Sequence, residues 1–173
     1  MYKKKYKAIF LDRDGTINKN YGYVSNFNKI TFLKKVPEAI RLANKNKYLV
    51  IIISNQSGVA RGYFKRKDVT LLHDKIYNYL IKKNKAKINK FYFSTYHKKF
   101  SNNRNSFMRK PNPGMIFKAV RDFNIDISKS FFVGDSDVDR LCAKNAGVQF
   151  IKKKSNLLTC IERGIKSKLN KKI

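Results

Sequence analysis

KAIFLDRDGTIN, residues 7–18, passes from an uninterrupted apolar run into a loop that carries Asp12 and Asp14 two positions apart. An apolar run without alternation is typical of a strand that is covered on both faces of a sheet. Runs of this kind recur along the chain. They are KAIFLD (7–12), YLVIIIS (48–54), KFYFS (90–94), SFFVGD (130–135) and VQFIK (148–152).

The segments between these runs carry helical patterns. We expect helices at about 37–46, 66–84, 114–124, 137–146 and 155–168. Strand alternating with helix predicts an α/β fold, a doubly wound parallel sheet flanked by helices. We expect a single domain over residues 1–173 and no large cap domain. The segments 13–36 and 95–112 lack clear periodicity, and such loops more often carry function than core.

The sequence excludes membrane insertion and favours a reducing compartment. Apolar runs such as YLVIII at 48–53 are too short to span a bilayer. No secretory apolar segment follows the amino terminus, and Cys142 and Cys160 are too few for a disulfide scaffold or a cysteine-based zinc site. We therefore expect a cytoplasmic protein without a membrane partner.

The chain is strongly basic, with 40 Lys and Arg against 11 Asp and Glu and a formal charge of +29. Such a charge suggests nucleic-acid binding, because lysine and arginine bind phosphate backbones. The lysines, however, occur as pairs and triplets along the whole chain together with abundant Asn and Ile, as biased nucleotide composition would produce. We favour a solvated basic surface and expect no specific nucleic-acid partner.

Five of the 11 acidic residues lie in two short stretches that each follow a strand: Asp12 and Asp14, then Asp135, Asp137 and Asp139. Loops at the carboxyl ends of the strands meet in one crevice of an open sheet. Clustered carboxylates repel unless a cation joins them, and oxygen ligands favour Mg²⁺. Alternatively, each aspartate caps a helix or a turn; for Asp137 and Asp139 both interpretations stay open.

Two other motifs follow predicted strands. SNQSGVARG (54–62) offers a hydroxyl, an amide and two glycines, groups that can cradle a phosphate. MRKPNPGM (108–115) places Arg109 and Lys110 ahead of two prolines, which hold the chain extended and begin the next helix. Each motif alone is a weak signal, but their order along the chain adds to it.

Together these motifs resemble the haloacid dehalogenase superfamily of phosphatases, with a DxD, a Ser or Thr, a Lys and an acidic motif in that order. FLDRDGTIN, GYV, SNQSGVARG, RKPNPGM and VGD resemble more closely the D-glycero-D-manno-heptose 1,7-bisphosphate 7-phosphatases. The resemblance runs from about residue 8 to about residue 150.

The resemblance implies a role for each matching residue. Asp12 would attack the phosphorus, and Asp14 would act as acid and then as base. Asp12, Asp135 and the backbone carbonyl of Asp14 would hold Mg²⁺, while Ser54 and Lys110 would hold the phosphoryl oxygens. The residues implied to contact substrate are Asn20, Tyr21, Gly22, Tyr23, Asn55, Gln56, Ser57 and Arg109.

The chain also departs from the family, which commonly holds a structural zinc with cysteine and histidine. The corresponding positions here are Ser94, Tyr96, Ser106 and Met108. We expect no zinc, and a loop held by packing of Tyr96, Phe100 and Phe107. His97 is interpreted as a surface residue, and Ser136 stands where the family has a lysine.

The function implied is that of a Mg²⁺-dependent phosphatase in nucleotide-activated heptose biosynthesis for lipopolysaccharide. A monomer would hydrolyse the 7-phosphate of a small sugar bisphosphate, D-glycero-D-manno-heptose 1,7-bisphosphate, through an aspartyl phosphate. Arg61 is open to two interpretations, a contact to the second phosphate or an ordinary surface arginine. The alternative functions are histidinol-phosphate phosphatase, polynucleotide 3′-phosphatase, and a degenerate basic module that binds nucleic acid.

Overall fold

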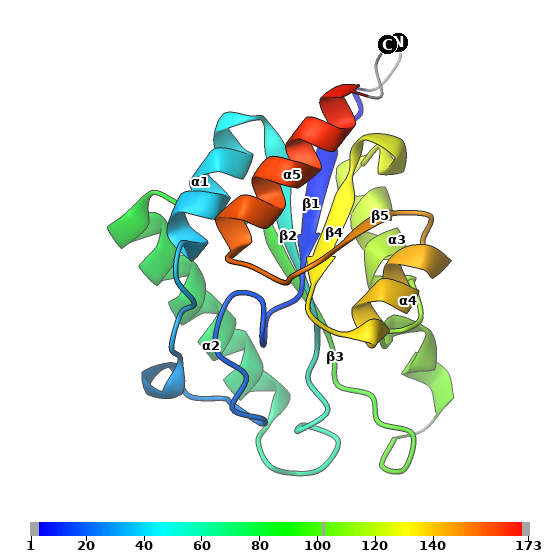
Figure 1. The fold of residues 1–173 in the computed structure, drawn as a ribbon. Coiled ribbons are helices and arrows are strands. Elements are labelled where there is room, and N and C mark those ends of the chain that lie inside the picture. Colours follow the sequence, from blue (N-terminus) through cyan, green and yellow to red (C-terminus); the bar gives the residue numbers. More distant parts are fainter. Residues whose placement is uncertain (1–3, 102, 171–173) are drawn as a thin grey trace.

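The computed structural model describes residues 4–101 and 103–170. These residues form a five-stranded parallel sheet in the order β3-β2-β1-β4-β5, with helices on both faces (Figure 1). The α/β prediction is confirmed, and every strand lies close to its predicted run. The strands are β1 (Lys7–Leu11), β2 (Tyr48–Asn55), β3 (Lys90–Ser94), β4 (Phe131–Gly134) and β5 (Gln149–Lys152).

The helices also follow the sequence pattern. They are α1 (Val36–Lys45), α2 (Arg66–Asn78), α3 (Gly114–Phe123), α4 (Asp137–Asn145) and α5 (Leu157–Leu169). The predicted helix 66–84 is divided, because α2 passes into the π-helical turn η2 (Tyr79–Lys83). Short 3₁₀ turns lie in the two predicted loops and before β4: η1 (Phe27–Lys29), η3 (Asn103–Met108) and η4 (Ile127–Lys129). In the described part of the chain, no helix is both long and apolar enough to cross a membrane.

The uninterrupted apolar runs are explained by helices on both faces of the sheet. Along β1, Ile9 and Leu11 pack in the core that α1, α2 and α5 cover. The alternate residues, Ala8 and Phe10, pack in the core that α3 and α4 cover. All four are fully buried, so each residue of the run contributes to one of two cores.

The strand order places a switch point beside β1. The chain passes from β1 outward through β2 to β3, then crosses back to place β4 on the other side of β1. Loops that leave the carboxyl ends of β1 and β4 therefore diverge to opposite faces, and the crevice between them is where ligands bind in open α/β sheets. The DxD loop after β1 and the acidic loop after β4 both begin there.

Candidate active site

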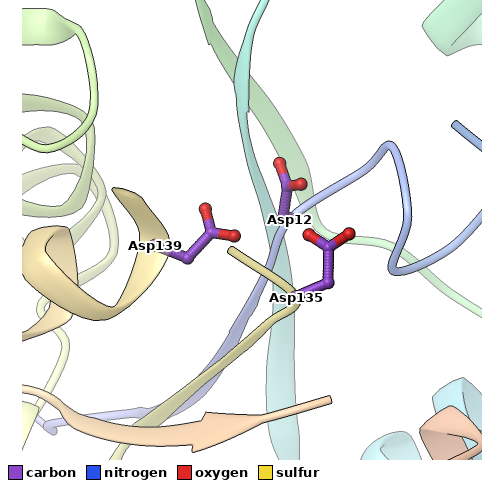
Figure 2. A group of neighbouring side chains, drawn as sticks. All are labelled: Asp12, Asp135 and Asp139. Carbon is purple, nitrogen blue, oxygen red and sulfur yellow. The ribbon is translucent and has the colours of Figure 1, made fainter. Parts of the chain in front are cut away.

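Three carboxylates meet at the switch point. Asp12 follows β1, Asp135 follows β4, and Asp139 lies in the first turn of α4 (Figure 2). One oxygen from each lies within 4.8 Å of the others. Gly15, at φ +85°, permits this approach, because a Cβ there would lie 1.9 Å from Asp135 Oδ2. The structure thus brings together the two aspartates that the strand ends predicted and adds Asp139.

Lys110 is buried against two of these carboxylates. Its Nζ lies 2.6 Å from Asp12 Oδ1 and 2.6 Å from Asp139 Oδ1. The Asn55 side chain, at the end of β2, accepts from the backbone N–H of Lys110 at 3.1 Å and donates to its carbonyl at 3.0 Å. One amide therefore fixes the RKP segment beside the carboxylates.

The charges of this group do not balance. Burial, partly opposed by Lys110 and reinforced by Asp139, raises the pKa of Asp12 to about 7. Burial and Asp139 also raise the pKa of Asp135. Burial alone would lower the pKa of Lys110, but the two carboxylates raise it above its ordinary value, so the ammonium stays charged. Three carboxylates and one ammonium leave excess negative charge, and an oxygen-only donor set of this kind fits a hard divalent cation such as Mg²⁺.

Asp139 caps helix α4 and also lies beside the other two carboxylates. It forms a capping box with Ser136: Ser136 Oγ accepts from the backbone N–H of Asp139, and Asp139 Oδ2 accepts from the backbone N–H of Ser136. Its other oxygen accepts from Lys110. Asp137 is exposed and pairs with Arg140 at 3.2 Å, as a surface residue does.

The Asp14 carboxylate points into a separate polar network. It accepts hydrogen bonds from Arg13, from Asn18 Nδ2 at 2.9 Å and from Gln56 Nε2 at 3.0 Å. The same Gln56 nitrogen donates to Ser54 Oγ at 2.7 Å. Gln56 therefore connects the hydroxyl after β2 with the second aspartate of the DxD.

The predicted substrate residues of the 20–23 segment lie at the surface. The Asn20 side chain accepts from the backbone N–H of Gly22, which has φ +80° and thus needs glycine. Tyr21 and Tyr23 are 58% and 50% exposed. The Tyr23 ring meets Tyr63 edge-on at 4.8 Å, so this segment touches the loop that follows SNQSGVARG. Ser57, within that motif, is buried, and its carbonyl accepts from the backbone N–H of Arg61.

A cationic and aromatic group surrounds Arg61. Arg61 Nη2 lies 2.8 Å from His97 Nε2, and the guanidinium lies over the rings of Phe100 and Tyr23 at 5.0 and 5.6 Å. Arg109 donates to the carbonyl of Tyr96 at 2.8 Å. Burial lowers the pKa of Arg109, and the nearby charge of Arg61 lowers it further. Two like charges close together favour the binding of an anion.

Comparison with known proteins agrees with this geometry. The family described as "Polynucleotide kinase 3 phosphatase" matches residues 7–156. A D-glycero-alpha-D-manno-heptose-1,7-bisphosphate 7-phosphatase of Burkholderia mallei is 39% identical over 147 residues, 83% of this chain and 77% of that protein. The D-glycero-beta-D-manno-heptose-1,7-bisphosphate 7-phosphatase of Helicobacter pylori is 36% identical over 152 residues, 88% and 83% of the two chains.

The chain belongs to the heptose bisphosphate 7-phosphatase family. It is therefore an enzyme, a phosphoric monoester hydrolase, and the predicted family is confirmed. Solved structures agree on the fold. A haloacid dehalogenase-like phosphatase from Mesorhizobium loti superposes with a TM-score of 0.83 at 27% identity, covering 95% of this chain and 88% of that one. The D,D-heptose 1,7-bisphosphate phosphatase of B. bronchiseptica, complexed with magnesium and phosphate, has a TM-score of 0.78 at 23% identity and covers 93% and 99%.

The segment after β3, which we expect to be held by packing and not by zinc, carries three aromatic rings. Tyr96 is buried, whereas Phe100 and Phe107 are more than half exposed. Phe100 lies against His97 and Arg61, and Phe107 lies against Phe117. Phe100 and Phe107 therefore pack at the surface of the loop, and of the three rings only Tyr96 is buried. His97, interpreted as a surface residue, is half-buried and bonded to Arg61.

Sequence reasoning assigned no role to Arg13, Asn18 or His73. Arg13 is 1% exposed, and Asn18 is fully buried. One signal was available for Arg13. It lies between two aspartates at the end of a strand, where a paired arginine is expected more than a free surface arginine. His73 carried no such signal, because its neighbours on α2 are ordinary helix residues.

Proposed function

We propose that this enzyme hydrolyses the 7-phosphate of D-glycero-D-manno-heptose 1,7-bisphosphate through an aspartyl-phosphate intermediate, with Mg²⁺ as cofactor. The observation that carries this proposal is the Lys110 ammonium 2.6 Å from Asp12, at the switch point, with the Asp14 carboxylate two residues further on. The relatives match most of the chain and are named as phosphatases of this substrate, which supports the choice of substrate.

In the first step an oxygen of Asp12 attacks the phosphorus, and the bond from phosphorus to the sugar oxygen breaks. Asp14, in its protonated form, gives its proton to that leaving oxygen. In the second step Asp14 takes a proton from water, whose oxygen attacks the same phosphorus. The bond to Asp12 then breaks, which returns a free carboxylate and releases inorganic phosphate.

The other residues stabilise charge on the phosphoryl group. Ser54 Oγ accepts from Gln56, so its own hydroxyl proton remains free to donate to a phosphoryl oxygen. Lys110 supplies a fixed positive charge that is buried and needs no rearrangement during the reaction. Asp12, Asp135 and the backbone carbonyl of Asp14 would hold Mg²⁺, which when bound offsets the repulsion between the anionic nucleophile and the phosphate; the Asp139 carboxylate lies beside Asp12 and Asp135.

The second phosphate of the substrate fits the cations beside the site. Arg61 and Arg109 lie close enough to affect one another, and Arg61 Nε is buried without a hydrogen-bond partner among the described residues. A bisphosphate offers one anion for Lys110 and another for these guanidinium groups. We propose that Arg61 and Arg109 bind this distal phosphate.

A 3′-phosphorylated oligonucleotide is the second candidate substrate. The matching family description and the formal charge of +29 favour it. The discriminating experiment compares phosphate release from heptose bisphosphate, histidinol phosphate and a 3′-phosphorylated oligonucleotide, in Mg²⁺ and at physiological salt. We expect kcat/KM to be highest for the heptose bisphosphate, and a faster oligonucleotide reaction would overturn the assignment.

The mechanism has its own test. Asp12→Asn is isosteric but cannot act as an anionic nucleophile, so it should abolish phosphate release, and Asp14→Asn should remove most of it. Turnover retained by purified Asp12→Asn, with contaminating phosphatase excluded, would refute the aspartyl phosphate.

A further inference from the structure

Arg13 is a buried cation that the reaction scheme above does not use. It lies between Asp12 and Asp14 in sequence, and its side chain is 1% exposed. Its Nε and Nη2 reach both oxygens of Asp14 at distances from 2.8 to 3.2 Å. This two-pronged contact fixes the plane of the carboxylate as well as its position.

The third nitrogen of Arg13 contacts His73. Arg13 Nη1 lies 3.2 Å from His73 Nε2. A guanidinium only donates, so Nε2 must accept and the ring proton must lie on Nδ1. Burial and the charge of Arg13 lower the pKa of His73 to about 3, which keeps the ring neutral and able to accept.

The His73 ring is itself fixed by aromatic packing. It stacks on Phe91 of β3 with ring centroids 4.6 Å apart and 18° between the planes. Phe93 meets its edge at 5.3 Å. Helix α2 and strand β3 therefore hold the ring, the ring holds Arg13, and Arg13 holds Asp14.

We propose that Arg13, anchored by His73, is the positioning residue that aligns the Asp14 carboxylate for proton transfer. This inference rests on the proposed role of Asp14 as acid and base. Proton transfer depends on the alignment of donor and acceptor, and small displacements of a catalytic group cost large factors in rate. Asn18 donates to one oxygen of the carboxylate and Gln56 to the other, and among the described residues only Arg13 contacts both.

A positioning role has a distinctive kinetic consequence. A sugar oxygen is a poor leaving group and needs the proton of Asp14, whereas p-nitrophenolate leaves without one. A misaligned Asp14 should therefore slow the first step, release of the leaving group, far more for the sugar phosphate than for p-nitrophenyl phosphate, whereas the second step, in which Asp14 acts as base, is common to both substrates. A general loss of structure would slow both substrates alike.

The chain offers matched variants for this experiment. His73→Phe keeps the stacked ring and removes the acceptor, and His73→Gln restores an acceptor at a similar reach. Arg13→Lys keeps the charge and removes the two-pronged contact. Arg66→Lys is the control, because Arg66 is exposed, lies on the same helix and covers the ring of Phe93.

We expect Arg13→Lys to lower the single-turnover rate of leaving-group release about 30- to 100-fold for heptose bisphosphate and less than about 3-fold for p-nitrophenyl phosphate. His73→Phe should lower the first about 10-fold with the same selectivity. His73→Gln and Arg66→Lys should remain within about 3-fold of the unsubstituted enzyme on both substrates. Equal losses of this first-step rate on the two substrates, or an unchanged first-step rate in His73→Phe, would overturn the proposal.

A double-mutant cycle separates positioning from folding. In an Asp14→Asn background there is no carboxylate to align, so His73→Phe should have no further effect on turnover of the sugar phosphate. An undiminished effect in that background would show that His73 acts through the fold instead, and this also contradicts the proposal. If Asp14→Asn itself lacks substrate selectivity, the proposed function of Asp14 fails, which is a distinct result.

Discussion

The Lys110 ammonium lies 2.6 Å from Asp12 Oδ1 and equally close to Asp139 Oδ1, so one buried cation compensates two buried carboxylates. Removing one partner of a buried ionic group leaves the others uncompensated, which costs more than the group contributes when intact. Lys110 therefore connects the stability of the site with its chemistry.

Replacing this cation should abolish most activity. Lys110→Met removes the positive charge that stabilises the phosphoryl oxygens and the contact that orients Asp12. We expect turnover to fall at least about 100-fold. Steady-state phosphate release in saturating Mg²⁺ measures this, with Lys118→Met, at a partly exposed position that pairs with Asp122, as the control. Activity within tenfold of the unsubstituted enzyme would show that Lys110 serves the structure alone.

The buried His73 makes stability depend on pH. Its pKa is about 3 in the folded protein, below the ordinary value of 6.5. Between these values the unfolded chain binds a proton that the folded chain does not, so stability falls as the pH decreases below about 6.5. The slope approaches about 1.4 kcal/mol per pH unit. His73→Gln lacks this group, so its urea-unfolding free energy should depend less steeply on pH between 6 and 4. Parallel curves for the two proteins would contradict this explanation.

Metal content tests the expectation that this protein binds no zinc. The positions that would supply thiolate and imidazole ligands are Ser94, Tyr96, Ser106 and Met108. We predict no stoichiometric zinc in the purified protein and full activity after treatment with a zinc-selective chelator. Elemental analysis that finds about one zinc per chain would refute this prediction and direct attention to His97.

Much of this site was predictable because backbone topology placed it. Asp12 and Asp135 follow apolar runs, and parallel strands bring their carboxyl ends to one edge whatever the side chains between them. Asn55 and Lys110 are 55 positions apart, and their pairing depends on how the loop before α3 folds. Sequence alone could not determine that contact.

Other parts depended on three-dimensional packing. Asp139 carries the spacing of an ordinary helix cap, and only the approach of Lys110 shows its second contact. Arg13 is a residue type that is almost always exposed, yet Asp14, Gln56 and His73 together satisfy its donors. The exposed Phe100 and Phe107 show the opposite case, because apolar residues of a loop need not enter the core.

The two arginines beside the site should discriminate a bisphosphate from a monophosphate. Arg61→Gln and Arg109→Gln each remove one cation from the proposed distal site. We expect KM for heptose 1,7-bisphosphate to rise about tenfold, with KM for a sugar monophosphate nearly unchanged, because the monophosphate makes no contact there. Equal changes in KM for both substrates would show that the two arginines stabilise the loop and do not bind the distal phosphate.

The basic surface provides the last prediction. Lys154 is exposed, and Lys171 and Lys172 lie outside the described residues. The positive charge of Lys153, in contrast, lowers the pKa of Asp135, against the upward effect of burial, so Lys153 is left unchanged in this experiment. If the surplus charge reflects composition, Lys154→Gln, Lys171→Gln and Lys172→Gln combined should leave turnover within a few-fold of the unsubstituted enzyme. A solvated charge distant from the reacting phosphate can only steer the encounter, so kcat/KM should change at low salt and much less at physiological salt. Elution from heparin should move to lower salt at the same time. A hundredfold loss of turnover at physiological salt, about 3 kcal/mol of transition-state stabilisation, would show instead that the carboxyl-terminal lysines belong to the active site.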